Sequence, residues 1–451
     1  MVGEKPCRDF EELELQKAKS GYKLVKSLFG KYEEIPEEWG MLHLHNTNIK
    51  IIDGDRGNEY PQETDFLASG YCLFLSTKNV TKKGFKFNEC SFITKEKDEK
   101  LRKGKLSRND IIITTRGTIG NIAYFDESIQ YDKIRINSGM VLLRNNDESI
   151  YQKFLYLFLR SNFIGKQFQS IQYGSAQPQL TIGTIKSLKI IIPPISEQQN
   201  IASILSNVDN LIEKYDEIIV QTKSLKQGLM QTLLTRGIGH KKFKKVYFGF
   251  GEVIEIPDEW ILKKLSEVAK IERGKFTHRP RNDPRFYGGK YPFIQTGDVG
   301  SSTGRITTFS QTLNELGLSV SKLFPKNTIV ITIAANIGST AITTFPVCFP
   351  DSLIGISSDE VNLSYLEHFL RTKKEHLNNI ATDSAQKNIN LETLRPLLIP
   401  IPSKDEQNKI TMVFENVDSK LFELESKKSH LESLKKGLMQ KMLTGQIRVT
   451  V

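Results

Sequence analysis

The chain has 451 residues and repeats itself at a fixed separation over long stretches. The segment Ser224–Ile238 recurs as Ser433–Ile447, and both copies contain Gly-Leu-Met-Gln. The same register reaches upstream to Glu197-Gln198, which matches Glu406-Gln407. A duplication of this size constrains the fold strongly, because each copy must form a similar structural unit.

A second pair of landmarks opens each copy. The pattern Ile-Pro-x-Glu-Trp occurs at Ile35–Trp39 and again at Ile256–Trp260. A Ser-Ala-Gln element follows at Ser175–Gln177 and at Ser384–Gln386. The separation of the landmarks shortens between these two pairs, so the length differences fall inside the copies, where surface loops tolerate them.

Within each copy the local patterns predict mostly strands. Residues 110–114 and 328–332 are short β-branched runs, each followed by an Ile-Gly turn. Residues 188–193 and 397–402 are apolar runs that end in proline and predict a closing strand. Between them, residues 150–168 and 364–380 each have the periodicity of an amphipathic helix.

A long helix is predicted after each copy, because apolar residues alternate three and four positions apart. Ser196 with Gln199, and Ser403 with Glu406, have the spacing of a capping box. At about 1.5 Å per residue, forty residues span roughly 60 Å, more than one turn of duplex DNA. The two helices are expected to pair antiparallel about a pseudo-two-fold axis. The predicted seam consists of Ile201, Ile204, Val208, Leu211, Ile218, Leu225 and Leu229 in the first helix, and of Ile410, Val413, Val417, Leu424, Leu431, Leu434 and Leu438 in the second.

The sequence therefore predicts an α+β protein with two globular domains rich in β-strands, each followed by a long α-helix, the two helices packing as an antiparallel coiled coil. The N-terminal segment is a candidate for a short helix that completes the pseudo-symmetry, and the glycine-containing connector is expected to be flexible. The predicted segments are 1–32 (N-terminal segment), 33–194 (first domain), 195–238 (central helix), 239–253 (connector), 254–402 (second domain) and 403–447 (C-terminal helix).

Charge and motif content restrict the classes of function. With 63 Lys and Arg against 52 Asp and Glu, the chain favours polyanionic partners. The four cysteines have no paired spacing, which predicts neither disulfides nor zinc and fits the cytoplasm. The sequence has no phosphate-binding Gly-x-x-x-x-Gly-Lys-Ser/Thr loop and no Asn/Asp-Pro-Pro-aromatic motif of amino-methyltransferases. We therefore predict no catalytic residues, no metal site and no membrane span.

Basic and amide side chains in loops are the candidate DNA contacts. Residues 273–285 carry five cations among prolines, and a merely solvated loop is the alternative. Arginine can pair with guanine, lysine mostly contacts phosphate, and the amides could recognise adenine or else cap a turn. The candidates are Lys78, Arg116, Lys133, Arg135, Gln177 and Gln179 in the first copy, and Lys275, Arg279, Arg281, Arg285, Gln386 and Asn388 in the second.

These motifs, in this duplicated order, resemble the specificity subunit of Type I restriction-modification enzymes. The resemblance covers Ile35 to Ile447 and includes Tyr291–Val299, the Ile-Pro-x-Glu-Trp opening and the Leu-Lys-x-Gly-Leu-Met-Gln ending of each helix. The first copy departs from it, having Lys78-Asn79 where the second has Gly297-Asp298. Such divergence is expected of domains that recognise different half-sites.

The resemblance implies two target-recognition domains that recognise the halves of a split, asymmetric site in double-stranded DNA, with the helices as a ruler for the spacer. It further implies docking of two adenine-N6 methyltransferase subunits and of restriction/translocase subunits. S-adenosylmethionine, ATP and Mg²⁺ would then be bound by those partners, and no cofactor by this chain.

Three other interpretations remain open from the sequence. The chain could be a non-enzymatic coiled-coil scaffold with two β-rich interaction heads, which would not bind duplex DNA in a salt-dependent way. A fused restriction-methylation enzyme is disfavoured by the missing motifs. An orphan or phase-variable specificity chain would be distinguished by its neighbouring genes.

Overall fold

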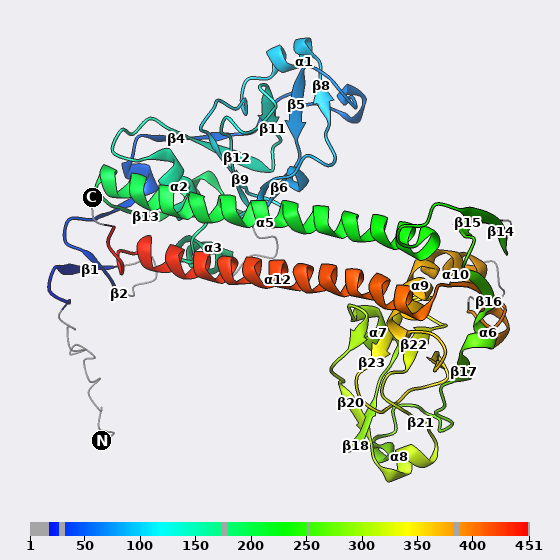
Figure 1. Ribbon diagram of the computed structural model, residues 1–451. Helices are drawn as coiled ribbons and strands as arrows, with labels where there is room; N and C mark the ends of the chain where they lie inside the picture. Colours follow the sequence, from blue (N-terminus) through cyan, green and yellow to red (C-terminus); the bar gives the residue numbers. More distant parts are fainter. Residues whose placement is uncertain (1–17, 27–31, 173–178, 250–251, 383–387, 450–451) are drawn as a thin grey trace, which may run out of the picture. The chain divides into compact units, whose positions relative to one another are not determined.

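The computed structural model describes residues 18–26, 32–172, 179–249, 252–382 and 388–449 (Figure 1). The chain divides into two compact units. The first unit comprises Met1–Lys214 with Lys427–Val451, and the second comprises Tyr215–Ser426. Each unit contains one globular body and part of each long helix.

The body of the first unit is built on a four-stranded antiparallel sheet of order β10-β9-β12-β4 and a three-stranded sheet of order β11-β5-β8. In β9, Ile111 and Ile113 enter one core cluster while Ile112 enters another. Successive side chains of a strand point to opposite faces, so a strand covered on both faces becomes a continuous apolar run. The strands are β1 (Tyr22–Lys26), β2 (Tyr32–Pro36), β3 (Gly40–His43), β4 (Ile49–Asp53), β5 (Cys72–Leu75), β6 (Val80–Thr81), β7 (Gly84–Phe85), β8 (Phe92–Ile93), β9 (Ile111–Thr114), β10 (Ile122–Tyr124), β11 (Ile134–Ile136), β12 (Met140–Asn145) and β13 (Lys189–Ile192).

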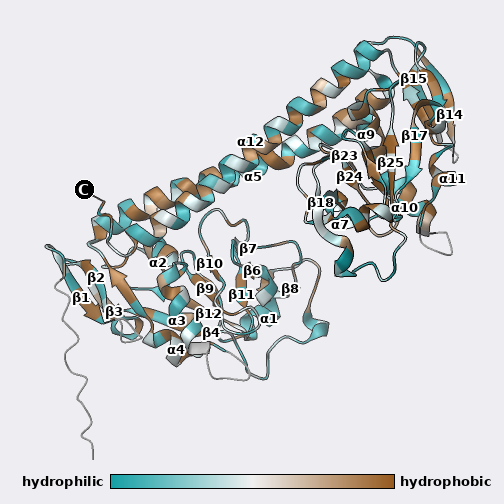
Figure 2. Ribbon diagram, turned by 90° about the horizontal axis from the view of Figure 1, so that it is seen from below, coloured by the Kyte–Doolittle hydropathy of each residue, from teal (hydrophilic) through white to brown (hydrophobic). Residues whose placement is uncertain are grey.

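The second unit repeats this plan with sheets of order β17-β25-β22-β23-β19 and β20-β18-β24-β21. In β22, Ile329 and Ile331 enter one cluster and Val330 another, as in β9. Figure 2 shows the apolar residues concentrated in these strands. The strands are β14 (Phe243–Gly249), β15 (Glu252–Pro257), β16 (Ile261–Lys264), β17 (Lys270–Arg273), β18 (Tyr287–Phe293), β19 (Arg305–Ile306), β20 (Gln311–Leu313), β21 (Leu323–Phe324), β22 (Ile329–Thr332), β23 (Thr340–Thr343), β24 (Val347–Cys348), β25 (Leu353–Ser357) and β26 (Leu398–Ile401).

Each amphipathic segment forms two helices rather than the single one predicted. In the second unit the break falls at Lys373, the C-cap of α9, whose side chain lies over the rings of Phe248 and Phe369. Several short helices precede strands. The helices of the two bodies are α1 (Lys95–Lys100), α2 (Gln152–Leu159), α3 (Asn162–Gln172), α4 (Ile182–Ser187), α6 (Leu265–Val268), α7 (Thr296–Ser301), α8 (Glu315–Ser319), α9 (Leu363–Thr372), α10 (Lys374–Thr382) and α11 (Leu391–Leu394), with 3₁₀ turns at Leu44–Asn46, Glu63–Asp65, Thr77–Asn79 and Pro284–Phe286.

Both segments that precede the Ile-Pro-x-Glu-Trp motif are β-hairpins. Strand β1 pairs antiparallel with β2, and β14 pairs antiparallel with β15. Of the segment expected to supply a short helix, described residues 22–26 form a strand instead, and residues 1–17 and 27–31 lie outside the described residues. The expected flexible connector is also corrected, since Phe248 in β14 is buried in the core of the second unit.

The two long helices, α5 (Ile195–Arg236) and α12 (Lys404–Met442), pack together antiparallel within each unit (Figure 1). Two equivalent ion pairs join them, Lys435 with Asp209 in the first unit and Lys226 with Asp418 in the second. Each pair contains the same two repeat positions with the helices exchanged. This reciprocity agrees with the predicted antiparallel pairing of the two helices.

The predicted seam is wrong at five positions. Ile204, Leu211, Ile218, Leu225 and Leu434 are exposed, whereas Leu205 and Ile219, each one residue after a predicted seam position, are buried. A straight helix has 3.6 residues per turn and drifts about 20° per heptad from a strict seven-residue repeat. The covered face therefore slips by one position along the helix. The buried or half-buried seam residues are Ile201, Val208, Leu229, Ile410, Val413, Val417, Leu424, Leu431 and Leu438.

The start of each long helix is tied to its body through the repeated Trp and Glu-Gln motifs. In the first unit the Trp39 indole donates to Glu197 at 3.0 Å, and the Arg448 guanidinium donates to the same carboxylate at 2.9 and 3.0 Å. In the second unit Trp260 donates to Glu406 at 2.9 Å.

The remaining polar partners of this junction differ between the units. His240 takes the place of the arginine, with its Nε2 at 2.8 Å from Glu406. The glutamines that follow the two glutamates, by contrast, form equivalent hydrogen bonds. Gln198 accepts from the Tyr151 N–H and Gln407 accepts from the Asn362 N–H, each at 2.8 Å. Of the predicted capping boxes, Ser196 lies inside α5, and Ser403 accepts from the Glu406 N–H while the Glu406 side chain serves the junction instead.

Candidate nucleic-acid interface

The basic loop of the second unit, residues 273–285, is held in place by two carboxylates. Arg279 and Arg281 both contact Asp351, and Arg279 also donates to the Phe276 carbonyl at 2.6 Å. Arg285 donates to Asp283 at 2.7 Å, and its hydrogen bonds hold the pKa of that carboxyl below its usual range. Lys275 is exposed on the same loop. The loop is thus an ordered surface with exposed guanidinium groups.

In the first unit the structure brings two predicted contacts together. Arg116 and Gln179 are exposed and line one cavity of about 360 Å³, together with Arg56 and Thr181. Lys78 is exposed in the adjacent 3₁₀ turn. Lys133 lies apart from this cavity, and its ammonium is 3.8 Å from the ring centroid of Tyr71.

Arg135 is not available for DNA contact, and this prediction is wrong. The residue is only 4% exposed, and its Nε donates to Asp98 at 2.5 Å. Its other nitrogens donate to the carbonyls of Asp98, Lys103 and Leu101 at 2.7 to 2.9 Å. The guanidinium is therefore fully used in fastening the α1 segment to β11.

Three further predicted amides cannot be placed as DNA contacts. Gln177 and Gln386 lie outside the described residues. Asn388 is half-buried at the edge of the described part of the second unit. These three remain predictions from the sequence.

The departure between the two copies at Lys78-Asn79 and Gly297-Asp298 conceals a shared turn. The Ser76 N–H donates to Asn79 Oδ1 at 2.9 Å, and the Gln295 N–H donates to Asp298 Oδ2 at 2.7 Å. Asparagine and aspartate thus close the same backbone turn at the end of equivalent strands, β5 and β18. The frame is common, and the side chains that it exposes differ.

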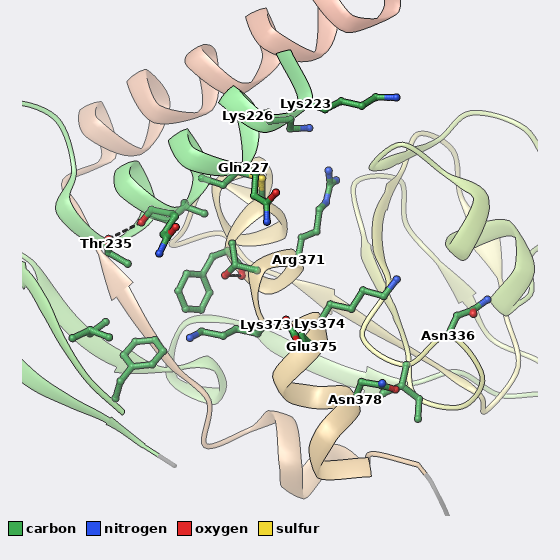
Figure 3. Close-up of a pocket in the computed structure, with 18 residues that line it drawn as sticks. Lys223, Lys226, Gln227, Thr235, Asn336, Arg371, Lys373, Lys374, Glu375 and Asn378 are labelled. Carbon is green, nitrogen blue, oxygen red and sulfur yellow. Dashed lines mark hydrogen bonds between the residues drawn. The ribbon is translucent and has the colours of Figure 1, made fainter. Parts of the chain in front are cut away.

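A groove in the second unit was not predicted from the sequence. It has a volume of about 1040 Å³ and lies between α5, the α9–α10 corner and the turn after β22 (Figure 3). Five cations line it, and we therefore call it the basic groove: Lys223, Lys226, Arg371, Lys373 and Lys374.

Part of this positive charge is balanced locally. Arg371 donates to Glu367 at 2.6 Å, and Lys223 lies 2.7 Å from Glu425. Burial raises the pKa of Glu367, opposed by its arginine partner. Lys374 is exposed at the rim. The cations of the groove come from segments some 150 positions apart, on α5 and at the α9–α10 corner, so no local sequence pattern could have assembled it.

The described residues also bear on other classes of function. No group of three or more His, Cys, Asp or Glu side chains that could hold a metal ion occurs in the described part of the chain. Within the same residues, no helix has the length and apolarity to cross a membrane.

The fold and the exposed loops define a class of protein: a duplicated α+β chain in which one frame presents two different sets of cationic and amide side chains. The sequence matches the family of the Type I restriction modification DNA specificity domain over residues 48–221 and 257–433. The chain therefore belongs to the Type I restriction-modification DNA specificity family.

Individual relatives agree with this assignment along most of the chain. The chain is 26% identical to the Type I restriction enzyme MjaVIII specificity subunit of Methanocaldococcus jannaschii, covering 92% of this chain and 94% of that protein. It is 23% identical to the HindI specificity subunit of Haemophilus influenzae, covering 87% and 98%. The fold resembles the Type I restriction-modification system S subunit from M. genitalium, with a TM-score of 0.54 at 16% identity, covering 90% of this chain and 96% of that one.

Proposed function

We propose that this chain is the non-catalytic DNA-sequence-specificity subunit of a Type I restriction-modification complex, and that its two units recognise different halves of a bipartite, asymmetric site. Family membership supports the role in DNA specificity. The shared turn supports the two-part site, because the equivalent positions Ser76 and Gln295 stand on one backbone frame with different hydrogen-bonding groups. Different groups on one frame recognise different base edges.

We propose that phosphate contacts supply much of the affinity in both units. In the first unit these would come from Lys78 and Arg116, and in the second from Lys275 and Arg285, all of which are exposed. Contacts of this kind position the protein without conveying sequence, and they make binding depend on salt. The positive charge of the basic groove would add to the electrostatic attraction of DNA to the second unit.

The paired long helices would set the spacer between the half-sites and dock two methyltransferase subunits. Their 42 and 39 residues would span about 60 Å each. The reciprocal Lys–Asp pairs support two equivalent docking surfaces, one in each unit. Exposed apolar side chains on a helix mark a surface for a partner. Those on these helices are Ile195, Ile204, Leu211, Ile218, Val220, Leu225, Met412, Phe422 and Leu434.

The chemistry would reside in the partners. S-adenosylmethionine would bind to the methyltransferase subunits, and ATP and Mg²⁺ to restriction/translocase subunits that join the same complex. The sequence supports this division, since it contains neither the phosphate-binding loop nor the amino-methyltransferase motif. We place the complex in the cytoplasm, where its DNA would be.

A selection from random duplex DNA tests the proposal. The chain is purified with the methyltransferase subunit encoded beside it, and bound duplexes are sequenced after several rounds. The expected product is a motif of two short specified parts separated by a fixed unspecified gap. Enrichment of one continuous motif would contradict the two-part site, and salt-independent binding without any motif would favour the scaffold interpretation.

A further inference from the structure

A small cavity on the second unit combines an apolar wall with a pair of exposed amides. It has a volume of about 400 Å³ and is walled by Phe276, Phe293 and Pro350. Gln295, Gln311 and Arg281 also line it. The proposed function uses Gln295 only as a position that differs between the units, and it does not use Gln311.

The two glutamines are fixed to each other and to the sheet. Gln295 Nε2 donates to Gln311 Oε1 at 2.7 Å. Gln311 lies opposite Phe293 in the antiparallel β18–β20 pairing, and the Gln295 N–H is fixed by Asp298. A residue at a strand end and a residue on the neighbouring strand thus present their amides as one pre-oriented group.

One hydrogen bond inside the pair leaves a defined edge. Each primary amide has one acceptor oxygen and two N–H donors. The internal bond uses one donor of Gln295 and engages the oxygen of Gln311. The Gln295 oxygen remains as an acceptor, one Gln295 N–H and both Gln311 N–H groups remain as donors, and both residues are exposed.

We propose that this amide pair recognises an adenine·thymine base pair in the major groove of the half-site bound by the second unit. The inference rests on the proposed function and adds the base and the side chains that recognise it. The Gln295 oxygen accepts from adenine N6–H and the Gln311 amide donates to N7, the pattern by which amides distinguish adenine. The apolar wall beside them takes the thymine methyl group.

Guanine is the poorer partner for this edge, because it presents two acceptors, O6 and N7, and leaves the Gln295 oxygen without a donor. Arg281 has the donors that guanine requires, but its guanidinium is turned to Asp351. We therefore assign Arg281 to phosphate contact or to a neighbouring base pair, and the amides to adenine.

The first unit carries different groups at the equivalent positions. Ser76 occupies the place of Gln295 in the shared turn. Ser91 occupies the place of Gln311, because the Phe74 N–H donates to the Ser91 carbonyl at 2.8 Å in the β5–β8 pairing, where Phe293 faces Gln311 in the second unit. Two serine hydroxyls cannot form the same hydrogen-bonding edge as two amides, so this preference for adenine belongs only to the half-site bound by the second unit.

The test uses the complex of the full chain with its methyltransferase subunits and measures the methylated motif by long-read sequencing. In the double variant Gln295→Ala/Gln311→Ala, one A·T position in one half-site should become unspecified, while the other half-site and the spacer stay unchanged. Discrimination at that position should fall by between about 5-fold and 150-fold, the range for one bidentate base contact. Asn379→Ala, an exposed amide on α10, is the matched control and should leave the motif intact.

An atomic version of the test replaces the adenine at that position by 7-deazaadenine, which lacks the N7 acceptor. The wild-type complex should bind this duplex more weakly than the normal one, and the double variant should bind both equally. An unchanged motif in the double variant, or equal binding of the two duplexes by the wild type, would overturn the assignment of the amide pair. The absence of any two-part motif in the wild type would overturn the proposed function instead.

Discussion

The junction between Trp39, Glu197 and Arg448 should carry a measurable share of the stability of the first unit. Glu197 is 2% exposed and accepts hydrogen bonds from the indole, the guanidinium and the Val449 N–H. In Glu197→Gln the amide oxygen can still accept from Trp39, but the charge opposite Arg448 is lost. The variant thus removes the ion pair and retains the shape of the side chain.

Removing one partner of a buried ion pair costs about 3–5 kcal/mol. The Arg448 side chain is 38% exposed, so solvent screens the interaction, and we expect a loss of about 2 kcal/mol. With a urea dependence of about 1–3 kcal/mol per molar, the unfolding midpoint should fall by about 1 M.

Tryptophan fluorescence can follow this junction alone, because the chain has two tryptophans, one in each unit. In a Trp260→Phe background the emission reports on Trp39. Glu406→Gln, which alters the equivalent junction in the second unit, is the matched control and should leave the Trp39 midpoint in place. A Trp39 midpoint that does not move in Glu197→Gln would refute the reasoning.

The same variant has a defined pH dependence. Burial would raise the pKa of Glu197, but the hydrogen bonds from Arg448, Val449 and Trp39 outweigh it and lower the pKa below its ordinary value. A carboxyl whose pKa is lowered on folding contributes stability above its unfolded pKa, and loses it as the pH falls through the folded value. The difference in the free energy of unfolding between wild type and Glu197→Gln should therefore be largest at neutral pH and vanish in acid.

Three further predictions concern the interface and the helices. Arg135→Ala should destabilise the first unit by about 3–5 kcal/mol in urea unfolding, because it leaves buried Asp98 with Lys105 as its remaining ion-pair partner, and it should leave the recognised motif unchanged; an altered motif at unchanged stability would contradict this. Arg279→Ala/Arg281→Ala should weaken DNA binding and reduce its salt slope by about one for each phosphate that the arginines neutralise, and an unchanged slope would remove the loop from the interface. A heptad inserted after Thr222, together with one after Phe422 to keep the antiparallel partners opposite, lengthens the helix pair by about 10 Å. Selection from random DNA should then recover both half-sites with a longer spacer, or show that the original spacer is no longer accepted. An unchanged spacer would show that the helices do not set it.

The elements predictable from the sequence are those whose pattern is local. The run at 328–332 is bounded by turns and all five of its residues are buried, so composition alone identifies strand β22. The repeat likewise predicts both long helices and their antiparallel pairing. By contrast, the hairpins β1–β2 and β14–β15 were not predicted, because strands with one exposed face and charged residues have a weak periodic signal.

The site was harder to predict, because it depends on contacts between distant positions. Arg135 stands on a strand near candidate loops, and only its contact with Asp98, 37 positions away, shows that it is structural. Gln295 lies within a segment that the sequence had already singled out, but its partnership with Gln311 depends on cross-strand register. Residue type therefore selects candidates, and the register of the sheet decides which of them meet.

The most direct measurement of the central claim is the N6-methyladenine pattern of a host that carries this chain and its neighbouring methyltransferase gene, compared with the same host without the chain. The account predicts a two-part, gapped methylation motif that is lost when the chain is removed. A gapped motif that persists without the chain, under an active methyltransferase, would contradict its role as the specificity subunit.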